Sequence, residues 1–293
     1  MLNRQRLILA LLARAGGPMS ATALVKLAFL VREETEVGHD GTFYSFVPYR
    51  YGPFSFALYR ELAALERDGY LRRSEKRVWL NPERPGLWEQ EIGRLPAVQA
   101  RAADEISEKY GRQSRGALIG SVYQRYPWYA RKSELTEFVP VKLPEPPRLP
   151  IAVYTVGYEG RSVDAFFDGL LRAGIRAIVD VRANPVSRKY GFAKRSMQRI
   201  AEDLGLAYHH LPELGIASQH RADLSDYDSY QLLLDEYEQK MLPKRSSQVT
   251  RAIELLRQKP SALLCVESDV RCCHRSRLAN RVASQSGLGV VHL

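Results

Sequence analysis

The chain has 293 residues, 45% of them hydrophobic and 26% charged, a composition typical of globular proteins. Its formal net charge of +10 favours a polyanionic binding partner, for which nucleic acid is the first candidate. No apolar run reaches the roughly 18 residues of a membrane span. Three cysteines exclude a disulfide framework, so we expect a cytoplasmic protein with reduced thiols and no membrane partner.

The beginning of the chain predicts three helices and then a hairpin. Apolar residues recur at helical spacing over 3–14 and 21–34, and Ser55 begins a third, amphipathic helix that ends at Asp68. Residues 70–80 predict a basic β-hairpin. This order is typical of a winged helix, whose third helix enters the major groove of DNA while the hairpin contacts phosphate. The expected DNA contacts are Arg60, Arg67, Arg72, Arg73, Lys76 and Arg77. A solvated basic face on a protein-binding domain is the alternative.

A proline-rich segment divides the chain. Residues 88–110 and 114–123 predict helices, and residues 139–150, VPVKLPEPPRLP, contain five prolines in twelve positions. Such a segment cannot form a helix or a central strand and is typical of a stiff extended linker. We therefore predict a winged-helix-like domain over residues 1–138, a linker over 139–150 and a larger α/β domain over 151–293.

The last part of the chain alternates strands and helices. Short apolar runs predict strands at 151–156, 177–181, 207–211, 262–266 and 289–293. Amphipathic segments between them predict helices at 163–173, 194–204, 230–242, 246–258 and 273–286. This alternation predicts the α/β class: a mostly parallel, Rossmann-like sheet with helices on both faces. Right-handed crossovers then bring the carboxyl ends of the strands to one edge.

Charged and polar side chains gather where the predicted strands end. Asp180 and Glu267 are the carboxylates that we expect to carry catalysis, and they would face one cleft if the second and fourth strands lie close together. The expected substrate-binding residues follow the same strands: Tyr158, Arg182, Arg188, Glu213, His274 and Arg275. A second basic cluster beside them is expected to contact nucleic acid: Lys189, Tyr190, Lys194 and Arg195. The alternative for Asp180 is a structural salt bridge with Arg182, Arg188 or Arg275.

Four sequence blocks of this half resemble a known family. TVGYEGRS, DVRANPVSRKYGF, HLPELG and CVESDVRCCHR occur in the order found in the domain of unknown function 488 family, over about residues 154–281. The family pattern usually has a histidine–serine pair after the first glycine, where this chain has Tyr158 and Glu159. The resemblance implies a site at these blocks and leaves the reaction open.

The cysteines admit three interpretations. Cys265 and Arg271 have the C-x5-R spacing of thiol phosphatases, but the intervening residues include two acids and no glycine, which disfavours phosphate binding. A zinc site formed by Cys272, Cys273 and His274 is disfavoured because adjacent ligands rarely all turn inward. We therefore expect no metal, and we interpret Cys265 as a small core residue.

Two functions agree with these patterns. The first is a DNA-repair hydrolase of the glycosylase type, in which the two carboxylates assist cleavage of a base–sugar bond and the base is flipped out of the duplex. The second is a DNA-binding regulator or sensor whose α/β domain binds a small anionic ligand without chemistry. No nucleotide-binding glycine fingerprint is present, so we expect no cofactor. The oligomeric state stays open.

Overall fold

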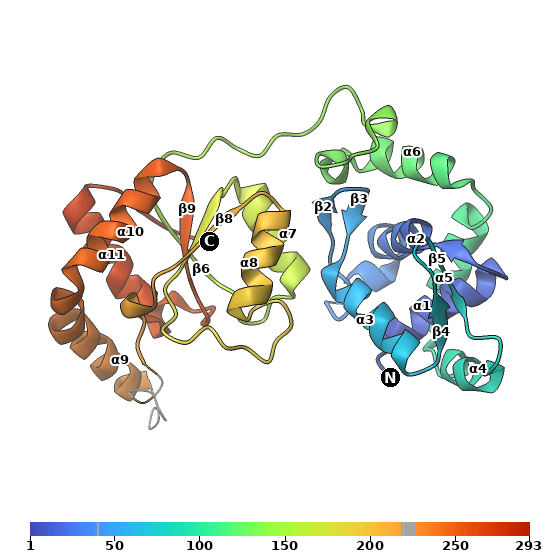
Figure 1. The fold of residues 1–293 in the computed structure, drawn as a ribbon, viewed down its shortest axis with the longest axis horizontal. Coiled ribbons are helices and arrows are strands. Elements are labelled where there is room, and N and C mark those ends of the chain that lie inside the picture. The colour runs from blue at the N-terminus through green and yellow to red at the C-terminus, as the bar shows by residue number, and fades with distance from the viewer. Residues whose placement is uncertain (40, 218, 220–226) are drawn as a thin grey trace. The chain divides into compact units, whose positions relative to one another are not determined.

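The computed structural model describes residues 1–39, 41–217, 219 and 227–293, and it divides into two compact units, Met1–Glu145 and Pro146–Leu293. The division falls inside the proline-rich segment 139–150. Figure 1 labels the elements of each unit. No helix in the described part of the chain is long and apolar enough to cross a membrane.

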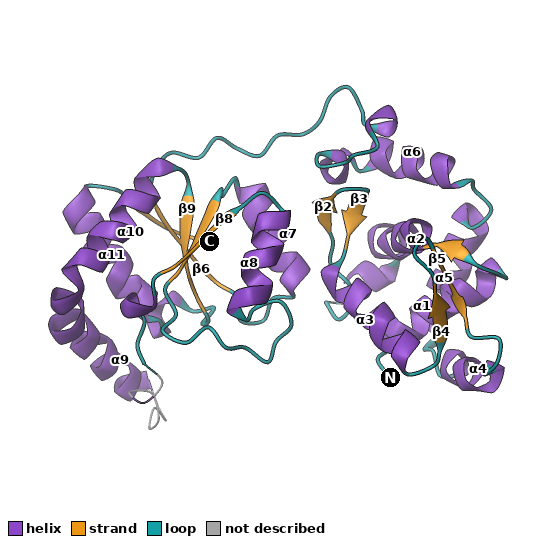
Figure 2. Ribbon diagram, viewed as in Figure 1, coloured by secondary structure: helices purple, strands orange, loops and turns teal. Residues whose placement is uncertain are grey.

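The N-terminal unit combines helices with small antiparallel sheets (Figure 2). Its helices are α1 (Asn3–Ala15), α2 (Ala21–Glu34), α3 (Phe56–Arg67), α4 (Pro85–Gly93), α5 (Ala97–Tyr110) and α6 (Arg115–Arg125). Its strands are β1 (Met19–Ser20), β2 (Val47–Tyr49), β3 (Gly52–Phe54), β4 (Leu71–Arg73) and β5 (Arg77–Leu80). The first sheet has the order β1-β5-β4, and β2 pairs with β3 in a separate hairpin.

Local sequence explains most of these boundaries. The hydroxyl of Ser20 accepts a hydrogen bond from the backbone N–H of Ala23, and the hydroxyl of Ser55 accepts one from Leu58, so both serines are N-caps. The single helix expected over 88–110 is instead two helices, α4 and α5. Pro96 lies at the break, because proline has no backbone N–H to continue the helical hydrogen-bond ladder. Strand β1 was not predicted, because two residues carry no periodicity.

The C-terminal unit confirms the predicted α/β class. Five parallel strands have the order β10-β6-β9-β7-β8. They are β6 (Val153–Gly157), β7 (Ala177–Asp180), β8 (Ala207–His210), β9 (Ser261–Cys265) and β10 (Val290–His292). The helices are α7 (Val163–Ala173), α8 (Lys194–Asp203), α9 (Tyr227–Glu236), α10 (Ser246–Gln258) and α11 (His274–Ser286).

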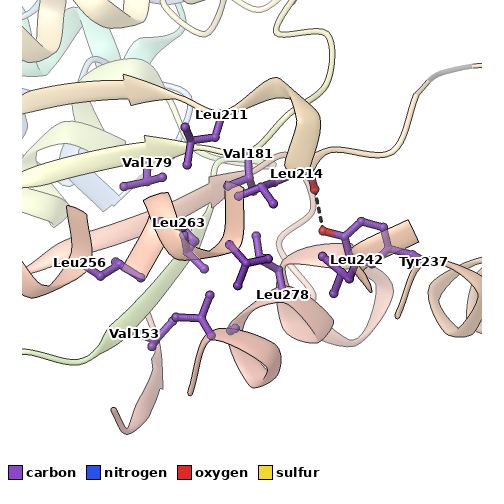
Figure 3. Packing of buried hydrophobic residues seen from close by; sticks show 14 of the residues in the cluster. Val153, Val179, Val181, Leu211, Leu214, Tyr237, Leu242, Leu256, Leu263 and Leu278 are labelled. Carbon is purple, nitrogen blue, oxygen red and sulfur yellow. Dashed lines mark hydrogen bonds between the residues drawn. The ribbon is translucent and has the colours of Figure 1, made fainter. Parts of the chain in front are cut away.

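Helices cover both faces of this sheet, with α7 and α8 on one side and α10 and α11 on the other (Figure 2). The expected helix 230–242 was wrong in its extent, because α9 ends at Glu236 and a π-helical turn, Tyr237–Met241, follows. That turn presents Tyr237 to the core between the sheet and α11, where its hydroxyl donates to the carbonyl of Leu214 at 2.6 Å (Figure 3).

Candidate functional site

The strand alternation assigns Asp180 and Cys265 to opposite faces of the sheet. Val179 and Val181 flank Asp180 and belong to the apolar cluster under α10 and α11, so Asp180 points to the other face. Leu263 also belongs to that cluster, and Cys265, two residues further along β9, shares its direction. The ends of β7 and β9 therefore build two separate polar clusters, one on each face.

The first cluster is a buried ion pair at the end of β7. Asp180 is fully buried and accepts hydrogen bonds from Nε and a terminal nitrogen of Arg182, at 2.8 and 2.5 Å, and from the hydroxyl of Tyr208 at 2.6 Å. Burial lowers the pKa of Arg182, but the hydrogen bond and charge of Asp180 outweigh this and hold it above its ordinary value. Burial and the negative charge of Asp180 raise the pKa of Tyr208 well above its ordinary value.

Aromatic rings enclose the same ion pair. Tyr158 stacks on Phe192 with centroids 4.2 Å apart, and its hydroxyl accepts a hydrogen bond from Arg182 at 3.2 Å. Arg182 also donates to the backbone carbonyl of Phe192 at 2.8 Å. Asp180, Arg182 and Tyr158 are all buried, and their hydrogen bonds hold the loop that follows β7. This is the structural salt bridge that the sequence left as an alternative.

The second cluster joins the end of β9 to the start of α11. Sγ of Cys265 lies 3.1 Å from Oε2 of Glu267 and 3.7 Å from Nδ1 of His274. Cys273, the N-cap residue of α11, completes the group, and the ligand atoms of Cys265, Cys273 and His274 all lie within 4.8 Å of one another. All three residues are buried, while Glu267 is half-buried at the edge.

Electrostatics distinguish the two thiols of this cluster. A hydrogen bond from Cys273, together with His274 and Glu267, lowers the pKa of Cys265 well below its ordinary value despite burial. Burial and the neighbouring Cys265 raise the pKa of Cys273 well above its ordinary value. Burial also raises the pKa of Glu267, and the adjacent Cys265 adds to that shift. The pKa values of the two thiols are therefore shifted in opposite directions.

Two residues hold the loop that carries Glu267. Arg275 is buried and donates to the backbone carbonyls of Glu267 and Ser268, so it braces this loop. Gly157, at the end of β6, lies against the same loop, because a Cβ at this position would overlap the carbonyl oxygen of Glu267. Together these two residues hold the backbone of the loop that places the carboxylate of Glu267 beside Cys265.

The other predicted residues occupy the surface. The side chains expected to bind substrate or nucleic acid beyond β7 and β8 are exposed: Arg188, Lys189, Lys194, Arg195 and Glu213. Tyr190 is half-buried. The ammonium group of Lys189 lies 5.5 Å from the ring centroid of Phe192, an aromatic residue of the first cluster. Strands β7 and β9 are adjacent, as expected, but the alternation of side chains along them places Asp180 on one face of the sheet and Cys265 on the other. Glu267 therefore lies with Cys265 and His274 and apart from Asp180.

The predicted DNA contacts of the N-terminal unit are displayed on α3 and on the β4–β5 hairpin. Arg60 and Arg67 lie on the exposed side of α3, opposite Leu58 and Leu62. The hairpin residues Arg72, Lys76 and Arg77 are exposed, and Arg73 is half-buried. Three of the basic residues form ion pairs with acids: Arg67 with Asp68, Arg72 with Glu83 and Arg73 with Glu66.

Comparison with known proteins identifies one family. The model of the family described as domain of unknown function DUF488 matches residues 162–282. This match confirms the family predicted from the four sequence blocks, although it begins at Ser162, after nearly all of the first block. No curated protein and no solved structure matches the chain.

Proposed function

The C-terminal unit carries a domain of the DUF488 family, and from this premise we propose that the chain is a DNA-binding regulator whose α/β unit is its sensor domain. The observation that carries the DNA-binding part is the order of elements in the N-terminal unit. Strand β1 lies between α1 and α2 and pairs with β5, so a three-stranded antiparallel sheet accompanies α1, α2 and α3. This order supports a winged helix, with α3 as the helix for the major groove.

The exposed side of α3 and the β4–β5 hairpin carry basic side chains that can contact the phosphates of DNA. Leu58, Leu62 and Leu65 bury one side of α3, which leaves Arg60 and Arg67 on the exposed side. The hairpin adds basic residues to a stretch with one acid, Glu75, between positions 72 and 77. Positive side chains on an exposed helix and an adjoining hairpin are the electrostatic footprint of a duplex-binding surface.

The buried ion pair favours the regulator over the glycosylase. The glycosylase hypothesis relies on Asp180 and Glu267 acting on one sugar, but Asp180 has its oxygens engaged by Arg182 and Tyr208 and lies on the opposite face of the sheet from Cys265. Base excision stays a prediction that would depend on Glu267 as its carboxylate. The cluster around Cys265, which is buried except for Glu267, is better suited to hold a ligand.

Fluorescence anisotropy with a labelled DNA duplex tests the proposal. We expect the full chain to bind with an affinity that falls steeply with salt, because each phosphate contact contributes about −0.9 to the slope of log K against log salt concentration. The double variant Lys76→Ala/Arg77→Ala should reduce the magnitude of this slope by about 2. Arg101→Ala/Arg112→Ala is the matched control, since it removes the same charge from exposed positions at α5 and just beyond it.

Three results would count against the proposal. Absence of salt-dependent binding by the wild-type chain would remove the DNA-binding function. An equal loss in the hairpin variant and the α5 control would show that net charge, and not the hairpin, attracts DNA. Release of a base by the wild-type chain, abolished by Glu267→Gln, would restore the glycosylase in place of the regulator.

A further inference from the structure

We propose that Cys265, Cys273, His274 and Glu267 bind one Zn²⁺ ion. The first three residues supply two sulfur atoms and one imidazole nitrogen, all within 4.8 Å of one another and all buried. Thiolate and imidazole are the ligands that zinc prefers in proteins. The inference deepens the proposed function by naming the ligand of the sensor domain, a metal cation in place of the small anion expected from the sequence. Its test uses no DNA, so the two proposals can fail separately.

The separations suit a tetrahedral ion. Zinc–sulfur bonds of ~2.3 Å and zinc–nitrogen or zinc–oxygen bonds of ~2.0 Å place the ligand atoms about 3.3 to 3.8 Å apart at tetrahedral angles. Sγ of Cys265 lies 3.7 Å from Nδ1 of His274 and 3.1 Å from Oε2 of Glu267. Only small side-chain rotations would therefore bring the ligand atoms of Cys265, Cys273 and His274 around one ion. The carboxylate of Glu267 contacts Cys265 but is not one of these three mutually close groups, so it would have to turn further toward the ion to become the fourth ligand.

The imidazole of His274 is already oriented for coordination through Nδ1. Its Nε2 lies 3.2 Å from the carbonyl oxygen of Val181, and a carbonyl only accepts hydrogen bonds, so Nε2 carries the proton. The lone pair is then on Nδ1, the nitrogen that faces Cys265. A backbone carbonyl on the far nitrogen is the usual second contact of a zinc-bound histidine. Tyr237 packs edge-on against the same ring, with centroids 5.3 Å apart, and restricts its rotation.

Backbone geometry explains why these positions meet. Cys265 is the last residue of β9, and the chain returns through a short loop and the 3₁₀ turn Val270–Cys272 before α11 begins. Cys273 caps α11 and His274 is its first residue, so strand end and helix start present their side chains to each other. Cys272 precedes the cap and is only half-buried, and it is not among the three clustered residues.

The fourth ligand closes the site toward solvent. Glu267 is the half-buried member of the group, and its loop is held by Arg275 and by the close approach of Gly157. Two thiolates and a carboxylate carry three negative charges, of which the ion neutralises two. The guanidinium of Arg275, on α11, donates to the backbone carbonyl of Glu267 and supplies a further positive charge beside this loop.

Zinc uptake by the full chain tests this site. The reduced protein is stripped with a chelator, incubated with Zn²⁺ alone and analysed for bound metal. We expect about one zinc ion per chain for the wild type, and loss of that ion in Cys265→Ser, Cys273→Ser and His274→Ala. Cys272→Ser is the matched control, because it removes a neighbouring thiol outside the cluster and should leave the stoichiometry unchanged. Glu267→Gln should weaken binding without abolishing it, since three ligands remain.

Cobalt substitution keeps the test valid if a buried variant fails to fold. Co²⁺ bound to the wild-type chain should give an intense thiolate-to-metal charge-transfer band and the strong visible bands of tetrahedral coordination. No uptake of either ion by the reduced wild type, a cobalt spectrum without thiolate bands, or equal loss of zinc in Cys272→Ser would overturn the site. The site would also be overturned if the chain contained a Cys265–Cys273 disulfide and still took up no metal after that disulfide had been reduced.

Discussion

The substitution Asp180→Asn tests whether the conspicuous carboxylate at the end of β7 stabilises the fold. Asp180 is fully buried and accepts hydrogen bonds from Arg182 and from Tyr208. Asparagine keeps the shape but leaves the guanidinium of Arg182, itself only 4% exposed, without its counter-ion. Breaking a buried ion pair by removing one partner costs about 3–5 kcal/mol, so we expect the free energy of unfolding of the C-terminal unit to fall by that amount.

Two further variants separate the ion pair from its hydrogen bonds. Asp180→Leu/Arg182→Met removes both charges, and because no buried charge is left unpaired, it should be much less destabilising than Asp180→Asn. Tyr208→Phe removes one hydrogen bond to a charged acceptor and should cost about 1.5–3 kcal/mol.

Hydrogen–deuterium exchange of peptides covering 177–192, followed in increasing urea, measures the stability of this region in the full chain. A change of less than about 1 kcal/mol in the free energy of unfolding for Asp180→Asn would refute the stabilising role of the ion pair, since a buried guanidinium without a counter-ion is expected to destabilise the fold by more than this. Greater destabilisation by the double variant than by Asp180→Asn would equally contradict it.

Two other substitutions probe the loop of Glu267 and the N-terminal unit. Gly157→Ala places a methyl group against the carbonyl of Glu267, so we expect it to displace the loop that carries Glu267. This displacement should destabilise the C-terminal unit by about 1–3 kcal/mol and weaken zinc uptake. Unchanged zinc uptake and unchanged stability would contradict the close packing of Gly157 on this loop. Burial lowers the pKa of Lys26 from 10.5 to about 7, so between these values the unfolded chain binds more protons than the folded one. The free energy of unfolding should then rise with pH through this window, by at most about 1.4 kcal/mol per unit, and Lys26→Met should abolish the rise. Tryptophan fluorescence in urea measures the free energy of unfolding of the N-terminal unit, because all three tryptophans precede residue 146. A free energy of unfolding that does not change with pH in the wild type would refute the prediction.

The sheet could be predicted because its strands β6, β7 and β9 are buried on both faces. The run 262–266 is continuously apolar and the run 177–181 is apolar except for Asp180, which is characteristic of parallel strands between two layers of helices. The short strand β1 could not be predicted in this way, because its two residues are defined by pairing with β5, which lies nearly sixty positions away. The break between α4 and α5 was in principle visible in the sequence, since Pro96 interrupts the expected helix.

The polar clusters were harder to predict than the sheet. The sequence left Arg182, Arg188 and Arg275 open as partners for Asp180, and the structure pairs Asp180 with Arg182. Residues two apart at a strand end point to the same face, which accounts for this pairing. It did not identify the pairing of Cys265 with Cys273 and His274. Cys272, Cys273 and His274 are adjacent in the sequence, whereas the cluster in the structure lacks Cys272 and includes Cys265 from the preceding strand. The sequence signal for this cluster is a ligand-type residue at a strand end followed by two more at the start of the next helix.

Thermodynamic linkage decides whether zinc acts as a signal or only as a structural ion. If zinc changes the affinity of the chain for DNA by some factor, DNA must change the affinity for zinc by the same factor. Zinc titrations with and without duplex should therefore give dissociation constants that differ by the ratio of the two DNA affinities, measured with metal-loaded and metal-free chain. A sensor requires a factor of about five or more, typical of allosteric coupling. Equal zinc affinities in the two titrations would contradict the sensor function, while the zinc site and the DNA surface would each stand on its own test.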